Sequence, residues 1–243
     1  KLRDYQQKAA ESFRDIGGEG GNGVLVLPCG AGKTVIGIAA MRDLQCETLI
    51  LTSNTTSVRQ WIAELLQKTT LSAEEIGEYS GQRKEVRPVT VATYHILTHR
   101  QGKGDEQQHM KLFNERRWGL IIYDEVHLLP APVFRATADI QATRRLGLTA
   151  TLVREDGREG DVFSLIGPKR YEMPWKRLEE QGWIASVDCT EIKVPLPDEI
   201  RETSKKAGKR EQYRLAAENP SKLRVIRQLV DLHRDAQTLI IGQ

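Results

Sequence analysis

Five short apolar runs recur in the first 150 residues, and their spacing limits the fold to few architectures. The first run, Gly23–Leu27, is rich in β-branched side chains, which is the pattern of a strand buried on both faces. Helical patterns lie between several runs, and the clearest spans residues 57–66. This alternation predicts an α/β domain with a mostly parallel sheet covered by helices on both faces. The predicted strands are residues 23–27, 48–52, 89–93, 120–124 and 145–149.

The first apolar run leads into a loop with the composition of a phosphate-binding site. Its glycines let backbone N–H groups turn toward a phosphate, and the helix predicted from Lys33 to about Leu44 adds unpaired N–H donors. We expect Lys33 to reach the β- and γ-phosphates of ATP, and the Thr34 hydroxyl to ligate Mg²⁺. The general pattern begins with glycine, whereas Leu27 stands there in this chain. The alternative is a glycine-rich turn before an ordinary helix. The predicted nucleotide-binding loop comprises Cys29, Gly30, Ala31, Gly32, Lys33 and Thr34.

Two carboxylates end the fourth apolar run. A carboxylate at the end of a buried strand is costly unless it meets a cation or hydrogen-bond donors. We therefore expect Asp124 to hold Mg²⁺ opposite Thr34, and Glu125 to orient and polarise an attacking water. An acidic pair alone is commonly a solvated strand end. Downstream of a strand and a Gly-Lys-Thr loop, it indicates a magnesium-dependent nucleoside triphosphatase.

The composition excludes several other classes of protein. The chain has 243 residues, of which 39% are hydrophobic and 28% charged, as in an ordinary globular protein. No apolar run is long enough to cross a bilayer and no secretory signal occurs, so no membrane partner is expected. Cysteines at 29, 46 and 189 fit neither a zinc site nor a disulfide framework. A net charge of +3 neither requires nor excludes nucleic acid.

These motifs resemble those of superfamily 2 DNA and RNA helicases, and further segments narrow the resemblance to the bacterial branch of the XPB family. Those segments are Asp-Glu-Val-His at 124–127, residues 146–156 and residues 165–169. The resemblance implies a RecA-like motor domain that uses ATP and Mg²⁺ and acts on DNA with 3′→5′ polarity. It also implies partners in DNA repair or transcription, and a cytoplasmic, nucleoid-associated location in bacteria or a nuclear one in a eukaryote.

The resemblance implies an adenine-binding segment at the start of the chain. Gln6 offers both a donor and an acceptor for the adenine edge, and Arg3 or Tyr5 would stack on the base. By sequence alone, the same residues are equally well interpreted as the start of an amphipathic helix.

The resemblance further implies strand ends that grip DNA. Hydroxyl and amide side chains there suit phosphate contacts that carry no sequence information. Trp61 lies among these residues, but it shares a helical face with Val58 and Leu65, so we predict that it belongs to the core. The implied DNA-contacting residues are Ser53, Asn54, Arg59, Gln60, Thr93 and Tyr94.

Two more family motifs follow the carboxylate pair. Thr149 and Thr151 match the motif that couples nucleotide state to DNA grip, although alone they would be ordinary strand residues. His127 is expected to link the hydrolysis site to that segment or to a facing domain. The motif associated with strand separation matches Arg154, Glu155 and Asp156, which alone would be an exposed charged loop.

The character of the chain changes near residue 187, so we predict domains at 1–186 and 187–243. By resemblance, the second part is the incomplete start of a second RecA-like domain, whose remainder would supply an arginine finger. We therefore expect a fragment that binds nucleotide weakly and is a poor motor alone.

Three elements are predicted in the second part. Residues 190–196 alternate like an edge strand, and residues 238–242 are an apolar strand. Between them, Asn219 and Pro220 are a cap and first-turn pair that open a helix running to about His233.

Two other functions fit parts of the sequence. One is the translocase subunit of a restriction system, which shares these motifs, although Leu27 and residues 154–156 favour the XPB family. The other is a nucleotide-gated module that binds DNA or a partner without moving. Glu125 argues against such a module, because a pure switch needs no water-activating carboxylate.

Overall fold

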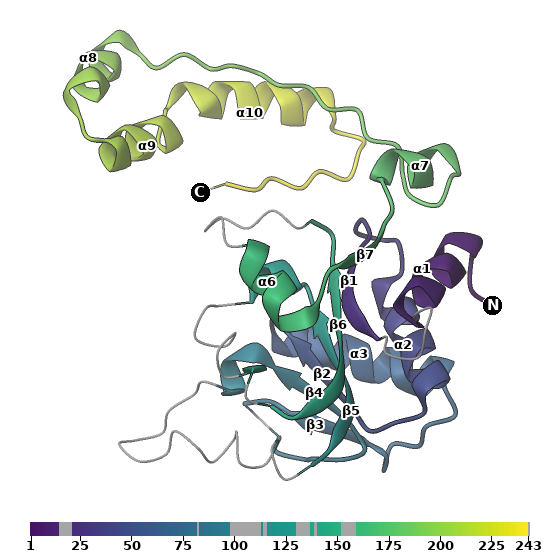
Figure 1. The fold of residues 1–243 in the computed structure, drawn as a ribbon. Helices are drawn as coiled ribbons and strands as arrows, with labels where there is room; N and C mark the ends of the chain where they lie inside the picture. The colour runs from purple at the N-terminus through teal and green to yellow at the C-terminus, as the bar shows by residue number, and fades with distance from the viewer. Residues whose placement is uncertain are drawn as a thin grey trace, which may run out of the picture. The chain divides into compact units, whose positions relative to one another are not determined.

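The protein forms two compact units in a computed structural model, Lys1–Ser186 and Val187–Gln243 (Figure 1). The structure describes residues 1–14, 21–81, 83–97, 113, 116–129, 137–138, 140–151 and 159–242.

The first unit is built on a seven-stranded sheet in which neighbouring strands are parallel, in the order β3-β4-β2-β5-β6-β1-β7. The five inner strands are those that the sequence predicts, with small differences at their ends. The strands are β1 Asn22–Val26, β2 Thr48–Thr52, β3 Ile76–Tyr79, β4 Val89–Thr93, β5 Trp118–Asp124, β6 Ala142–Thr149 and β7 Lys169–Glu172.

The two edge strands, β3 and β7, are not predicted from the sequence. Both are only four residues long. An edge strand is paired on one side and often carries charges that discourage pairing with other molecules. The sequence Lys-Arg-Tyr-Glu of β7 is of this kind, so it lacks the apolar run that marks the inner strands.

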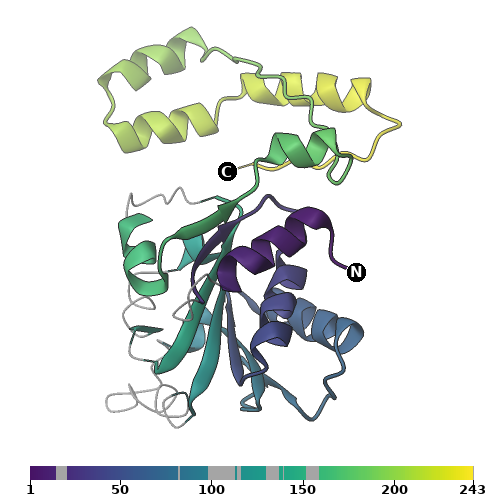
Figure 2. The ribbon, with the colours of Figure 1, turned by 45° about the vertical axis from the view of Figure 1, so that its right-hand side comes forward.

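Helices cover both faces of the sheet and confirm the predicted α/β architecture. Figures 1 and 2 show α1 Asp4–Arg14, α2 Lys33–Leu44 and α3 Thr55–Lys68 on one face, and α6 Glu159–Ile166 on the other. Successive strand residues serve opposite faces, as the pleat requires. Ile50 packs into the core beneath α1–α3, whereas Leu49 and Leu51 pack into the core on the side of α6. The described residues of this unit also form η1 Tyr94–Leu97, η2 Val126–Leu128 and α7 Trp175–Glu180.

The register of the parallel strands aligns their carboxyl ends. Val26 pairs with Thr149, Asp124 pairs with Leu148, and Thr52 pairs with Thr93. Ligands bind at this edge in open parallel sheets. The predicted phosphate loop, carboxylate pair and coupling segment therefore follow neighbouring strand ends.

The second unit is helical, with α8 Asp198–Lys206, α9 Lys209–Ala217 and α10 Ser221–Leu232. The predicted helix near Asn219 is confirmed as α10. The Asn219 Oδ1 accepts from the Ser221 backbone N–H at 3.0 Å, and its Nδ2 donates to the carbonyls of Val194 and Pro195 at 3.3 and 3.2 Å. These bonds tie the start of α10 to the preceding extended segment.

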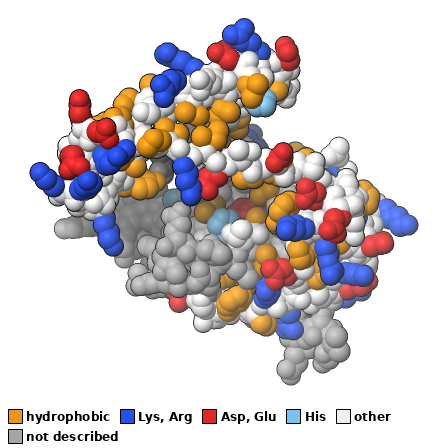
Figure 3. All heavy atoms as spheres, turned by 90° about the horizontal axis from the view of Figure 1, so that it is seen from above, with side chains coloured by type: hydrophobic (Ala, Val, Ile, Leu, Met, Phe, Trp, Pro, Cys, Tyr) orange, Lys and Arg blue, Asp and Glu red, His pale blue; other side chains and the backbone are white. Residues whose placement is uncertain are grey.

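The predicted strands at 190–196 and 238–242 are wrong, since neither segment pairs with a neighbour. A strand needs a partner for its N–H and C=O groups, and the described part of this unit offers helices instead. Asn219 is the only buried residue in the described range 187–242. Figure 3 shows hydrophobic side chains gathered at the surface of this unit, and on α10 they include Leu223, Leu229, Val230 and Leu232.

None of the described helices combines the length and apolar character needed to cross a membrane.

Arg145 connects β6 to the segment that follows β5. Its guanidinium donates to the Tyr123 hydroxyl at 2.6 Å and to the carbonyls of Thr137 and Ile140 at 3.1 and 2.7 Å. Arg145→Ala removes the donors of these three bonds, so we expect it to lower the free energy of unfolding by about 2–4 kcal/mol. Urea denaturation measures this loss.

Arg170→Ala is the matched control. Arg170 is exposed on the edge strand β7 and its Nε makes one bond, to the Asn22 carbonyl at 3.0 Å. An equal loss of stability in both variants would contradict the role given to Arg145.

Candidate functional site

The predicted phosphate loop lies between β1 and α2, as the sequence indicates. Gly30 and Gly32 both have φ of 78°, in the left-handed region that disfavours side chains. A Cβ on Gly32 would also lie 2.6 Å from Nε2 of Gln6. Leu27, the departure from the usual pattern, is fully buried in the core, and its N–H donates to the Thr149 carbonyl at 2.9 Å. It therefore extends the strand rather than lining the loop.

Lys33 and Glu125 form an ion pair at this edge of the sheet. Lys33 Nζ lies 3.0 Å from Oε1 of Glu125, and the lysine side chain is only 10% exposed. Glu125 has φ 50° and ψ 51°, which costs a non-glycine residue on the order of 1–3 kcal/mol. Its Oε2 is buried and has no hydrogen-bond partner in the described part of the chain. A strained carboxylate with an unused oxygen is suited to bind a water beside a phosphate.

Asp124 is held by the indole of Trp61. The Trp61 Nε1–H donates to Oδ2 of Asp124 at 2.8 Å. Burial raises the pKa of Asp124, and the charge of Glu125 raises it further, while the Trp61 hydrogen bond and Lys33 oppose the rise. A buried carboxylate of this kind gains from a cation.

The side chains here fit magnesium. Mg²⁺ prefers oxygen ligands and commonly takes one or two from the protein, with water and phosphate supplying the rest. Asp124 and the Thr34 hydroxyl near the start of α2 supply such oxygens. Among the described residues, no three His, Cys, Asp or Glu side chains gather as a metal cluster.

His127 joins the carboxylates to the end of β6. Its Nδ1 lies 2.8 Å from Oγ1 of Thr149 and 3.5 Å from Oε2 of Glu125. The Thr149 hydroxyl donates to the Thr151 carbonyl, so it accepts from His127, and Nδ1 carries the proton. The structure therefore brings together Glu125, His127 and Thr149, which is one of the two links that the sequence suggests for His127.

The predicted adenine segment contacts the phosphate loop. The Tyr5 hydroxyl and Gln6 Nε2 both donate to the Ala31 carbonyl, at 2.9 and 3.0 Å. The Arg3 N–H donates to Oε1 of Gln6 at 3.0 Å. An amphipathic helix does begin at Asp4, but these bonds also fix its first turn against the loop.

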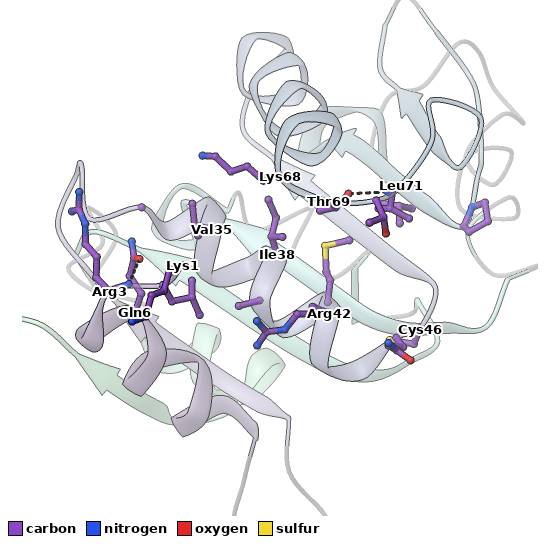
Figure 4. A pocket seen from close by; sticks show the side chains of 18 of the residues that line it. Lys1, Arg3, Gln6, Val35, Ile38, Arg42, Cys46, Lys68, Thr69 and Leu71 are labelled. Atoms are coloured by element: carbon purple, nitrogen blue, oxygen red, sulfur yellow. Dashed lines mark hydrogen bonds between the residues drawn. The ribbon is translucent and has the colours of Figure 1, made fainter.

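A groove beside this segment runs along α2. Figure 4 shows Arg3 and Gln6 at one end, close to Val35, and Lys68 and Leu71 farther along. Gly30 and Gly32 also line it. The groove therefore places free space beside both the adenine segment and the phosphate loop.

The sequence analysis misses Trp183. The Arg3 guanidinium lies over its indole ring, 4.1 Å from the ring centroid. The following Ile184 lies close to the phosphate loop, since a Cβ on Gly30 would be 3.6 Å from its Cγ2. No local sequence pattern could have indicated this contact, because Arg3 and Trp183 lie near opposite ends of the sequence of unit 1.

The predicted DNA-contacting residues follow β2 and β4 or lie on α3. Asn54 caps α3, with Oδ1 accepting from the Ser57 N–H at 2.9 Å and Nδ2 donating to Ser53 at 3.1 Å. Arg59 and Gln60 are exposed on the same helix, and Thr93 is largely buried. Tyr94 is buried, and its hydroxyl donates to the Asp124 carbonyl at 2.8 Å. Its side chain is therefore engaged inside the domain.

The predicted residues Arg154, Glu155 and Asp156 lie outside the described residues. Thr151, at the edge of the described range, is exposed.

Comparisons with known proteins place the chain in a family. The model of the family described as "Type III restriction enzyme, res subunit" matches residues 1–154. The chain is 60% identical over 242 residues to "DNA 3'-5' helicase XPB" of Kineococcus radiotolerans, which covers all of this chain and 42% of that protein. It is 37% identical over 239 residues to the yeast "General transcription and DNA repair factor IIH helicase/translocase subunit XPB/SSL2", covering 96% of this chain and 28% of that protein.

A solved structure supports the fold. The Pyrococcus furiosus Hef helicase domain superposes with a TM-score of 0.61 at 20% identity, over 84% of this chain and 44% of that one. The fold and the phosphate loop define a RecA-like P-loop domain. The chain belongs to the family of that matching model, and it is an XPB-type member of it. It spans about two fifths of the length of its bacterial relative.

The buried charge of Asp124 leads to a prediction about stability. Asp124→Asn removes the charge and keeps an oxygen that accepts from Trp61. Without Mg²⁺ we expect it to raise stability by about 1 kcal/mol, or roughly 2–4 °C in thermal midpoint. Because the pKa is raised, this gain is full above the raised value, where Asp124 is ionised, and shrinks as the pH falls through it. Thermal melts across a pH series measure it.

Asp43→Asn is the control with the opposite sign. Burial opposes ionisation of Asp43, but hydrogen bonds from Arg14 and Arg42 outweigh it and hold the pKa below its ordinary value. This variant should lose stability at neutral pH and approach the wild type on acidification. A metal-free Asp124→Asn variant that melts below the wild type would contradict the account of Asp124.

Proposed function

We propose that this chain contains the first motor domain of an ATP-driven DNA helicase or translocase with 3′→5′ polarity. The observation that carries the proposal is the pair of Lys33 Nζ and Glu125 Oε1, 3.0 Å apart, beside a glycine loop and a strand-end aspartate. This arrangement supports phosphate binding and water activation at one place. The name of the bacterial relative, a DNA 3′-5′ helicase, supports the polarity and the substrate.

Each residue at this edge of the sheet has a proposed role in ATP hydrolysis. Lys33 binds the β- and γ-phosphates and leaves Glu125, so the phosphates replace the carboxylate as its partner. Glu125 then orients the water that attacks the γ-phosphate, and accepts its proton. Asp124 and Thr34 hold Mg²⁺, which neutralises charge on the phosphate oxygens when it is bound. His127 passes a change at Glu125 to Thr149 through their hydrogen bond.

Gln6 would select adenine. Its Oε1 accepts from Arg3 and its Nε2 donates to Ala31, which leaves one lone pair and one hydrogen for the adenine edge. One face of the Arg3 guanidinium packs on the Trp183 ring, and its other face would stack on the base.

Gln6→Ala should lower the preference for ATP over GTP by about tenfold, since a lost pair of hydrogen bonds is worth about 1–2 kcal/mol. The ratio of dissociation constants, measured with fluorescent ATP and GTP analogues, is the readout. Gln7→Ala is the control, because the Gln7 side chain bonds to Glu11 instead. If the ratio in Gln6→Ala equals that in Gln7→Ala, Gln6 does not read the base.

The DNA path would follow the ends of β2 and β4 and helix α3. Ser53, Asn54 and Thr93 offer hydroxyl and amide groups there, and Arg59 and Gln60 lie exposed on α3. Such groups suit phosphate contacts. Repair or transcription proteins are the proposed partners, in keeping with the name of the yeast relative.

Unit 2 would be the start of a second RecA-like domain. Its exposed apolar side chains on α10 and at 239–241 support this assignment, because exposed apolar surface of this kind usually packs against another part of the protein. The remainder would supply an arginine finger across the nucleotide.

The name of the matching family model favours a second candidate, the translocase subunit of a restriction system. That model matches residues 1–154, whereas the XPB-type relatives match nearly the whole chain, which favours the first candidate. DNA cleavage coupled to translocation by the full-length protein would favour the second.

ATP hydrolysis by the chain extended to the full length of its relatives tests the function. We expect DNA to stimulate hydrolysis and Lys33→Ala to abolish it. Without an arginine finger, the 243-residue chain should turn over about 10³-fold or more slowly and should not unwind duplex. If DNA does not stimulate ATP hydrolysis by the full-length protein, or if that protein hydrolyses no ATP, a nucleotide-gated module is favoured. Robust unwinding by the 243-residue chain would contradict the two-domain requirement.

A further inference from the structure

The indole of Trp61 touches the nucleotide site from outside it. The ring lies on α3, is only 1% exposed, and packs in the core as the sequence predicts. A core position does not require a specific partner for the indole N–H. Here that partner is Oδ2 of Asp124, at 2.8 Å, the carboxylate that the proposed function assigns to Mg²⁺.

Gly37 in α2 fixes the position of this ring. A Cβ on Gly37 would lie 2.7 Å from Cη2 of Trp61, closer than real Cβ contacts, and 3.4 Å from Cδ1 of Ile122. The ring therefore occupies the space that a side chain at position 37 would fill. The Trp61 ring therefore contacts α2, which begins at the phosphate loop, and Asp124, which ends β5.

We propose that Trp61 is a positioning residue that orients the Asp124 carboxylate for the metal–nucleotide complex. The proposal rests on the proposed function. The indole N–H occupies one lone pair of Oδ2 and so restrains rotation of the carboxylate, whose other lone pairs stay available to a metal ion. Partners of metal ligands act in this way, and losing one typically lowers metal affinity by about 10–100-fold.

Trp61→Phe removes the indole N–H and keeps an aromatic ring at this position. The smaller ring also loses packing against Gly37, so a second buried Trp→Phe substitution serves as the control. The affinities of the chain for ADP are measured with and without Mg²⁺. In the wild type, Mg²⁺ should tighten ADP binding. In Trp61→Phe that Mg²⁺-dependent gain should fall by about tenfold or more, while metal-free ADP binding changes less than about twofold.

Trp118→Phe is the matched control. Trp118 is equally buried, and its Nε1–H donates to the Phe113 carbonyl at 3.0 Å. It begins β5, whereas Asp124 ends it, so the same substitution removes a buried indole bond away from the site. Its Mg²⁺-dependent gain should equal that of the wild type.

Indole NMR gives a second readout that needs no variant to be active. The chain has four tryptophans, and Phe variants of the other three, Trp118, Trp175 and Trp183, assign the Trp61 signal by elimination. The Trp61 N–H signal should shift with Mg²⁺ and ADP together and stay near its place with ADP alone. If Trp61→Phe fails to fold, this titration of the wild type decides.

Two results would overturn the proposal. One is a folded Trp61→Phe variant whose Mg²⁺-dependent gain equals that of Trp118→Phe. The other is a Trp61 signal that does not respond to Mg²⁺ with ADP although the nucleotide binds. In either case Trp61 is a core residue and the proposed function stands. A wild-type chain that binds no nucleotide with Mg²⁺ would overturn the proposed function as well.

Discussion

The parallel register between β5, β6 and β1 is the constraint on which the candidate site depends. It sets the end of β1 against Thr149 and the end of β5 against Leu148. Because the three strands end at one edge, Lys33 at the start of α2 and Glu125 just after β5 lie close enough to form an ion pair. A shift in this register would separate the two partly buried charges and leave each of them without its partner, which is costly.

The site is electrostatically incomplete in the protein alone. Glu125 pairs with Lys33 through one oxygen, and its other oxygen has no hydrogen-bond partner among the described residues, while burial raises the pKa of Asp124. Lysine therefore compensates one carboxylate and tryptophan the other. A nucleotide with a divalent cation would bring the missing charges of both signs, which explains why unpaired groups are tolerated here.

Sequence patterns predict the inner sheet and α2 because buried strands carry continuous apolar runs and the helix begins at a lysine motif. Sequence patterns fail to predict elements that depend on distant parts of the chain or that lack a continuous apolar run. β3 and β7 are short edge strands, and residues 238–242 are apolar but find no strand to pair with. The two nucleotide motifs were recognisable from their composition. The contacts of Trp61 with Asp124 and of Trp183 with Arg3 were not, since both join distant parts of the chain.

The close approach of Gly37 and Trp61 has an evolutionary consequence. The Trp61 ring occupies the volume that a side chain at position 37 would need, so position 37 cannot grow unless the residue at 61 becomes smaller. A lineage that acquires alanine at 37 must also reduce the ring at 61, and it then loses the indole that donates to Asp124. Homologous sequences should therefore vary at these two positions together, and pairs with a bulky residue at both should be missing among them.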